Sequence, residues 1–114
     1  MLNVHCGGTL VQHLPDIISE ESHLTTVGQF STTEIDLDSK SKLGRLFGAT
    51  ITGACHHHQG IDKVGSGLQI VARAKDGTVE AVEAHAQSFV VGVQWHPEVS
   101  LDNRLFQALV NAVY

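Results

Sequence analysis

Alternating apolar and polar positions recur through the middle of the chain and predict β-strands. Near the end of segment 30–37, Thr, Ile and Leu alternate with Glu and Asp, which is the period of a half-buried strand. Similar patterns predict strands over 49–52, 68–74 and 79–84. The Asp76-Gly77 pair between the last two is a tight-turn signal, so these two strands are expected to form a hairpin.

The end of the chain has a different pattern, in which a continuous apolar run is followed by helical spacing. Residues 89–95 are nearly all apolar, which predicts a strand covered on both faces and ended by Pro97. The spacing beyond it predicts an amphipathic helix over 101–113, with Asp102 near its start as a cap. The apolar face of this helix is formed by Leu105, Phe106, Leu109, Val110 and Val113.

Three shorter segments complete the organisation of the chain. Apolar spacing over 43–47 predicts a short helix closed by Gly48. The polar stretch 16–28 is expected to be a loop. Gly65-Ser66-Gly67 is too short for a phosphate-binding loop and is expected to be a turn before the next strand.

Composition bounds the class of protein. The 114 residues are enough for one domain at most, and 42% apolar with 17% charged residues is typical of a globular chain. Seven Lys and Arg against twelve Asp and Glu give a net charge of −5, which argues against a nucleic-acid partner. No apolar run approaches the ~20 residues that a membrane-spanning helix needs. Two cysteines make no disulfide framework, so a reduced, cytoplasmic chain is expected.

The sequence Gln94-Trp95-His96-Pro97-Glu98 is the sharpest chemical signal. A buried strand would deliver His96 to its exposed end, where a rigid scaffold fixes the imidazole as general-base catalysis requires. Glu98 can reach back to the other ring nitrogen, set the tautomer and stabilise the imidazolium. The two residues are therefore candidate members of a catalytic triad. Taken alone, a strand-end histidine followed by a solvated glutamate explains the same pattern.

Five motifs follow one another along nearly the whole chain. They are NVHCGGTLVQHLPD at 3–16, HHQ at 57–59, DGTVEAVE at 76–83, GVQWHPE at 92–98 and LFQALV at 105–110. In this order they resemble the C-terminal half of class I glutamine amidotransferase-like proteins. The resemblance is greatest to the γ-glutamyl-γ-aminobutyrate hydrolase branch of that family.

The resemblance implies an α/β fold, with residues 1–114 forming a partial domain, the C-terminal portion of a flavodoxin-like amidotransferase domain. It also implies hydrolysis of a small γ-glutamyl amide through a Cys-His-Glu triad, with no metal and no organic cofactor. A thiolate attacks the amide carbonyl, a γ-glutamyl thioester forms, and water releases glutamate. In that scheme His96 is the base and later the acid, and Glu98 orients it. His57 and His58 are implied to line the substrate pocket.

The family carries its nucleophile on a strand-turn-helix elbow with a G-x-C-x-G pattern, which this sequence lacks. Cys6 would lie one or two helical turns past that elbow, and Cys55 stands where the family usually has serine. Both cysteines are expected to be small apolar filler. The chain is therefore expected to lack the N-terminal strands, the oxyanion loop and the nucleophile, and to be inactive alone.

Two alternatives of another class stay open. The chain could be a non-catalytic binding or regulatory module, or half of a split enzyme that a second chain completes. Without inner parallel strands beside it, the apolar run 89–95 is expected to expose an unpaired edge that favours self-association.

The remaining polar clusters have structural explanations. Cys55-His56-His57-His58 lacks the sequence spacing that is typical of zinc ligands. In addition, neighbouring residues on a strand point to opposite faces, so at most two of these four side chains share a side. Glu80 and Glu83 are expected on an exposed strand face rather than as a catalytic pair. Solvated surface is expected for Arg104, Lys40 and Lys42.

Overall fold

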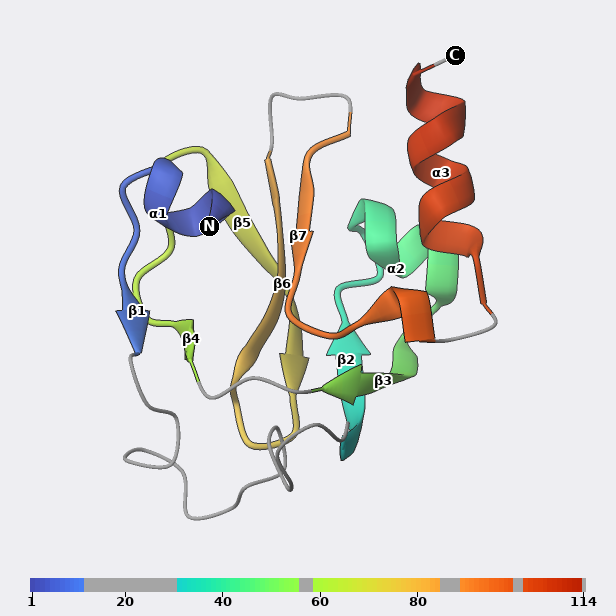
Figure 1. Cartoon of the computed structure of the whole chain (residues 1–114), viewed down its shortest axis with the longest axis horizontal. Helices are drawn as coiled ribbons and strands as arrows, with labels where there is room; N and C mark the ends of the chain where they lie inside the picture. Colours follow the sequence, from blue (N-terminus) through green and yellow to red (C-terminus); the bar gives the residue numbers. More distant parts are fainter. Residues whose placement is uncertain (12–30, 56–58, 85–88, 100–101, 114) are drawn as a thin grey trace.

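The computed structural model describes residues 1–11, 31–55, 59–84, 89–99 and 102–113 (Figure 1), and the predicted loop 16–28 lies outside these ranges. Within them, five strands form one sheet in the order β3-β2-β5-β6-β7, and every neighbouring pair is antiparallel. These strands are β2 (Ser31–Leu37), β3 (Thr50–Cys55), β5 (Leu68–Ala74), β6 (Val79–Ala84) and β7 (Val91–Val93).

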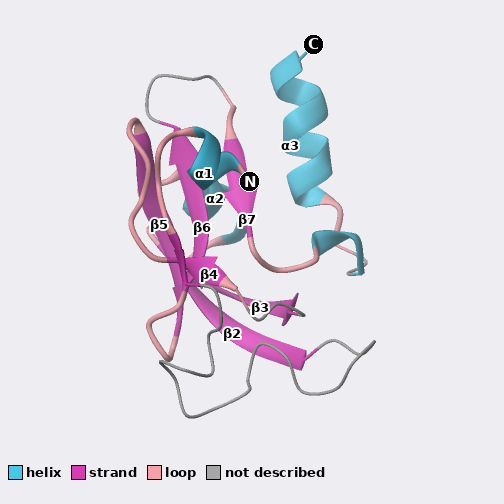
Figure 2. Cartoon of the chain, turned by 60° about the vertical axis from the view of Figure 1, so that its left-hand side comes forward, coloured by secondary structure: helices cyan, strands magenta, loops and turns pink. Residues whose placement is uncertain are grey.

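Short elements pack around this sheet, which curls so that β2 and β3 run across the ends of β5 and β6 (Figure 2). A two-stranded sheet pairs β1 with β4. The bounds of the other elements are α1 (Leu2–His5), β1 (Leu10–Val11), α2 (Lys42–Phe47), β4 (Gly60–Ile61), a 3₁₀ helix (Pro97–Val99) and α3 (Arg104–Val113). In the described ranges no helix combines the length and apolar character needed to cross a membrane.

The local signals in the sequence correctly locate the central strands and the short helix. The hairpin of β5 and β6 turns at Gly77, whose φ of 89° explains the Asp-Gly signal. Helix α2 begins after Ser41, whose side chain accepts a hydrogen bond from the Gly44 N–H at 2.8 Å. It ends at Gly48 with a φ of 96°, as predicted.

The core lies where the curled sheet, α2 and the end of β7 meet. Its fully or nearly fully buried members include Ile35 of β2, Leu43 of α2 and Cys55 of β3. Trp95, just after β7, is 6% exposed and belongs to the same cluster. Aliphatic side chains of β5 and β6 form a second cluster, against which Leu2 and Ile61 pack.

The amide of Asn3 ties α1 to the loops beside it. Asn3 is 2% exposed, and its Nδ2 donates to the carbonyl oxygens of Thr9 (3.2 Å) and Lys63 (3.0 Å). Its Oδ1 accepts from the Gly65 N–H at 2.7 Å. All of these partners are backbone groups, so the side chain replaces missing secondary-structure bonds between α1 and residues 63–65.

The expectation that Glu80 and Glu83 occupy an exposed strand face is wrong. Glu80 is 0% and Glu83 6% exposed. The Glu83 carboxylate accepts the backbone N–H groups of Lys42 (3.0 Å) and Leu43 (2.9 Å), the first two residues of α2. For Glu83 the alternation in β6 was misleading because these two backbone donors of α2, some forty residues away in the sequence, compensate for burying the carboxylate.

The structure also differs from prediction at the C-terminal end. Strand β7 is shorter than 89–95, and its residues are half-buried rather than covered on both faces. Val91 and Val93 pack against the core cluster, and both also line an open hollow beside α3. Helix α3 begins at Arg104, three residues later than predicted, and Oδ1 of Asp102 accepts the Arg104 N–H at 3.1 Å. Its apolar face is open, with Phe106, Leu109 and Val110 45%, 47% and 49% exposed.

Replacing Glu83 with Ala is expected to lower the free energy of unfolding by about 2–3 kcal/mol, because it leaves two helix-start N–H groups without their acceptor. Urea unfolding followed by circular dichroism measures the change. The matched control is Glu34→Ala, which removes an exposed 3.3 Å ion pair with Lys75 and is expected to cost less than about 1 kcal/mol. Equal losses in the two variants would contradict the capping role of Glu83.

Candidate active site

The candidate base, His96, lies where the chain leaves the sheet after β7. Its backbone N–H donates to the carbonyl oxygen of Ala54 in β3 at 2.8 Å, and its carbonyl oxygen accepts from the Val99 N–H at 3.2 Å. Strands β3 and β7 are at opposite ends of the sheet order. The curl of the sheet therefore brings its two ends together at His96 and fixes the backbone on both sides of the ring.

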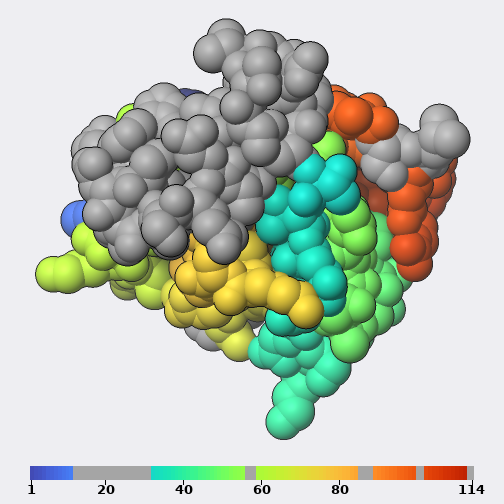
Figure 3. All heavy atoms as spheres, turned by 90° about the horizontal axis from the view of Figure 1, so that it is seen from below, coloured from blue at the N-terminus to red at the C-terminus, as the bar shows by residue number. Residues whose placement is uncertain are grey.

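The close approach of β3 to the residue before His96 depends on Gly53. A Cβ atom at this position would lie 2.7 Å from Cδ1 of Ile35 and 3.0 Å from Cβ of Trp95. Any larger residue would separate the two ends of the sheet or displace the tryptophan. Viewed from below, β2 and β3 lie side by side, with the C-terminal residues in orange and red next to β3 (Figure 3).

The imidazole of His96 and the carboxylate of Glu98 face each other, with Nδ1 and Oε1 2.7 Å apart. A carboxylate can only accept, so the proton of the neutral ring lies on Nδ1 and the basic lone pair on Nε2. The two side chains are 37% and 59% exposed, so the pair lies at the surface, where a substrate can reach it.

The pKa of the Glu98 carboxyl is lowered from its ordinary value of 4.5. The largest cause is a hydrogen bond from its own backbone N–H, followed by the hydrogen bond from His96. Glu98 is therefore ionised at neutral pH, the state in which it can orient and stabilise an imidazolium.

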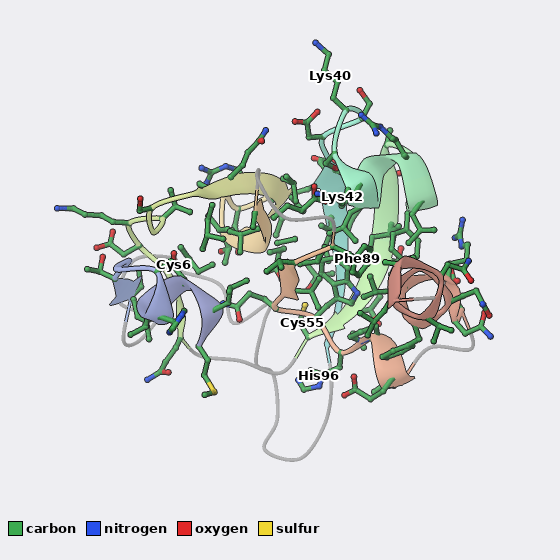
Figure 4. All side chains as sticks on the ribbon, turned by 90° about the horizontal axis from the view of Figure 1, so that it is seen from above. Cys6, Lys40, Lys42, Cys55, Phe89 and His96 are labelled. Atoms are coloured by element: carbon green, nitrogen blue, oxygen red, sulfur yellow. The ribbon has the colours of Figure 1, made fainter. Side chains whose placement is uncertain are left out.

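Neither cysteine is placed to act on an exposed substrate beside His96. Cys55, the last residue of β3, is 0% exposed, and its Sγ donates to Oε2 of Glu80 over 3.9 Å. Cys6 follows α1 and lies well away from His96 (Figure 4). Both positions agree with the prediction that these cysteines are structural.

Sequence reasoning missed the contacts by which Arg104 joins the start of α3 to α2. The Arg104 guanidinium forms an ion pair with Asp102, donating to both of its carboxylate oxygens at 2.6–3.0 Å, and it donates to the Leu46 carbonyl oxygen of α2 at 3.1 Å. Its carbon Cζ lies 4.8 Å from the centre of the Phe47 ring. The hydrogen bond from Arg104 lowers the pKa of Asp102. Although half exposed, Arg104 is thus a connection between helices rather than a free surface charge, a role that only the fold reveals.

The space beside His96 is small in the described structure. A cavity of about 50 Å³ is lined by residues of β3, Phe47, Trp95, His96, Pro97 and Asp102. A larger hollow of about 180 Å³ lies at the same end of β7, where Gln94 meets Met1, Asn3 and Ile61. Gln94 Nε2 donates to the carbonyl oxygen of Gln59 at 3.5 Å, so the last residue of the HHQ motif lies close to the strand that carries His96.

The other predicted site residues, His57 and His58, lie outside the described residues, so their role in substrate binding stays a prediction. The prediction that residues 55–58 form no zinc site also concerns these histidines, so it stays a prediction. Among the residues that the structure does describe, no group of three or more His, Cys, Asp or Glu side chains converges on a metal-sized site.

Sequence comparisons agree with the predicted family. Residues 1–98 match the family described as peptidase C26. The Mycobacterium tuberculosis protein Rv2859c, provisionally named a glutamine amidotransferase, is 48% identical to this chain over 113 residues. These residues cover 98% of this chain and 37% of that protein. The Escherichia coli γ-glutamyl-γ-aminobutyrate hydrolase PuuD is 41% identical over 61 residues, 49% of this chain and 24% of that enzyme. The chain thus spans well under half the length of these two relatives.

Solved structures confirm the predicted α/β fold. A Thermoplasma acidophilum protein described as one of the subunits of a GMP synthase superposes with a TM-score of 0.74 over 97% of this chain and 51% of that chain, at 17% identity. A Thermotoga maritima glutamine amidotransferase superposes with a TM-score of 0.63 over 98% of this chain and 41% of that chain, at 15% identity. At such low identity the likeness shows the fold alone, which is that of part of a class I glutamine amidotransferase domain.

Replacing His96 with Ala is expected to raise the pKa of Glu98 toward 4.5, because one of its two hydrogen bonds is lost while the backbone bond remains. The depressed pKa stabilises the folded state fully above 4.5, and this stabilisation is lost as the pH falls through the lowered pKa. A carboxyl ¹³C NMR titration measures the shift.

The matched control for this titration is Arg104→Ala. This variant should raise the pKa of Asp102, because its main hydrogen-bond partner is removed, and it should leave the pKa of Glu98 unchanged. A Glu98 pKa that does not respond to the loss of His96 would show that the pair does not exist in solution.

Proposed function

This chain belongs to the peptidase C26 family, and from that premise we propose that it carries the proton-transfer residues of a hydrolase site for γ-glutamyl amides. His96 is the general base and acid, and Glu98 is the residue that orients it. The observation that carries the proposal is the 2.7 Å contact between His96 Nδ1 and Glu98 Oε1. The similarity to PuuD, named for γ-glutamyl-γ-aminobutyrate hydrolysis, supports the substrate class.

The proposed reaction follows from the tautomer that Glu98 imposes. Nε2 of His96 takes the proton of a cysteine thiol, and the thiolate attacks the γ-carbonyl carbon of the substrate. His96 returns the proton to the leaving amine as the C–N bond breaks, which forms a γ-glutamyl thioester. His96 then takes a proton from water, the hydroxide attacks the thioester, and glutamate and the thiol are released. The Glu98 carboxylate stabilises the imidazolium in both steps.

We assign the nucleophile to none of these 114 residues. Cys55 is fully buried, and Cys6 lies on another side of the molecule. The cavity of about 50 Å³ at His96 is also far smaller than the ~300 Å³ at the lower end of ligand pockets. We therefore propose that the thiol and part of the substrate site come from other polypeptide, and the chain alone is expected to be inactive.

The test is glutamate release from γ-glutamyl-γ-aminobutyrate by the chain alone and after co-expression with the part of the M. tuberculosis relative that the match does not cover. We expect no release from the chain alone and release from the co-purified pair. In the pair, His96→Asn should lower kcat by about 10⁶-fold and Glu98→Gln by about 10³–10⁴-fold.

Cys55→Ser is the control for this experiment, because a structural cysteine can be replaced without loss of kcat. Full activity of the His96→Asn pair would contradict the assigned base. Glutamate release by the chain alone would contradict its inactivity, and loss of that release in Cys55→Ser would make Cys55 the nucleophile.

A further inference from the structure

The carboxyl group of Glu80 lies in the interior of the protein, and the proposed reaction does not use it. Glu80 belongs to β6 and is 0% exposed. Burying a carboxyl group costs free energy, and hydrogen bonds to its oxygen atoms have to offset that cost. The role of Glu80 therefore depends on what its polar atoms contact.

Glu80 contacts two segments that are far apart in the sheet order. Its Oε2 accepts the Cys55 S–H over 3.9 Å, at the last residue of β3. Its backbone carbonyl oxygen accepts the Gln94 N–H at 2.8 Å, just after β7. Since β3 and β7 are the two ends of the sheet order, one residue of β6 joins both of them.

Both contacts lie next to the residue that we propose as the general base. Ala54, which precedes Cys55, accepts the His96 N–H at 2.8 Å, and Gln94 lies two residues before His96. Figure 4 shows Cys55 and His96 close together in the view from above, in agreement with this backbone bond. The bonds therefore form a closed loop that runs through Glu80, the end of β3, His96 and the end of β7.

The side-chain contact in this loop spans strands that are not neighbours. Two strands, β2 and β5, separate β3 from β6 in the sheet order, so no ladder of backbone bonds holds them together. A thiol is a weak donor, but Cys55 and Glu80 are both 0% exposed, so water does not compete for either group. Moving β3 away from β6 would take this donor from a buried carboxyl oxygen, and that cost favours the closed arrangement.

We propose that Glu80 is a positioning residue for His96. Its buried carboxyl group holds the end of β3 against β6 and thereby keeps the backbone of the base in place. The inference rests on the proposed function, in which His96 transfers the protons. A displacement of about 1 Å in a reacting group can cost about 10²-fold in rate, so a brace behind the base affects catalysis without touching the substrate.

Hydrogen exchange in the 114-residue chain tests the brace directly. Glu80→Leu fills the core position without offering an acceptor, and it keeps the backbone bond from Gln94. We expect the His96 amide to exchange about ten-fold faster or more, relative to the Asp38 amide, which donates to the Val71 carbonyl oxygen at 2.8 Å. Glu80→Gln keeps an acceptor oxygen and should return this ratio to within about three-fold of its original value.

Kinetics of the pair co-expressed with the unmatched part of the M. tuberculosis relative test the effect on catalysis. Glu80→Leu should lower kcat about ten-fold or more and leave KM within about three-fold, because the base is displaced and the substrate is still bound. Glu80→Gln should recover most of kcat. The matched control is Glu34→Leu on β2, an exposed glutamate that should change neither kcat nor the exchange ratio.

Three results would overturn the proposal. They are an unchanged exchange ratio in Glu80→Leu, an unchanged kcat of that variant in an active pair, and a loss in Glu80→Gln as large as in Glu80→Leu. If the unaltered pair releases no glutamate, the proposed function is refuted, while the exchange ratio still decides whether Glu80 holds the backbone of His96. If circular dichroism shows that Glu80→Leu does not fold, Cys55→Ala removes the donor of the same contact and replaces it in both measurements.

Discussion

One backbone hydrogen bond, from the His96 N–H to the Ala54 carbonyl oxygen, closes the curled sheet on itself. It joins the two strands that are furthest apart in the sheet order, and every intervening strand contributes to the curl that makes the contact possible. Gly53 admits the Trp95 side chain at the same junction, so the closure is packed as well as bonded. The position of the imidazole is therefore a property of the whole sheet rather than of the short segment that follows β7.

Local sequence signals were sufficient for the elements whose geometry is decided by neighbouring residues. The hairpin at Gly77 and the ends of α2 at Ser41 and Gly48 follow from turn and capping chemistry alone. The facing of His96 and Glu98 was also foreseeable, because a two-residue spacing after a strand leaves little freedom. The catalytic role of this pair was an inference from family resemblance, and it remains a proposal.

Burial was harder to predict wherever it depends on residues distant in the sequence. Glu83 is buried because the start of α2, some forty residues earlier, supplies two N–H groups to its carboxylate. In the opposite direction, the apolar patterns of β7 and α3 suggested burial, yet the described chain covers both elements only in part. Hydrophobic periodicity predicts which face of an element is apolar. It does not predict whether other residues of the same chain cover that face.

The side chain of Asn3 has a mechanical consequence for α1. An amide is the one neutral group that can donate to two carbonyls while accepting from an N–H, and at Asn3 all of these partners belong to the backbone of two separate loops. Such bonds are directional, so the four-residue helix cannot slide or rotate without breaking them together. One side chain thus fixes the position of α1 relative to Thr9 and residues 63–65, and these segments depend on it together.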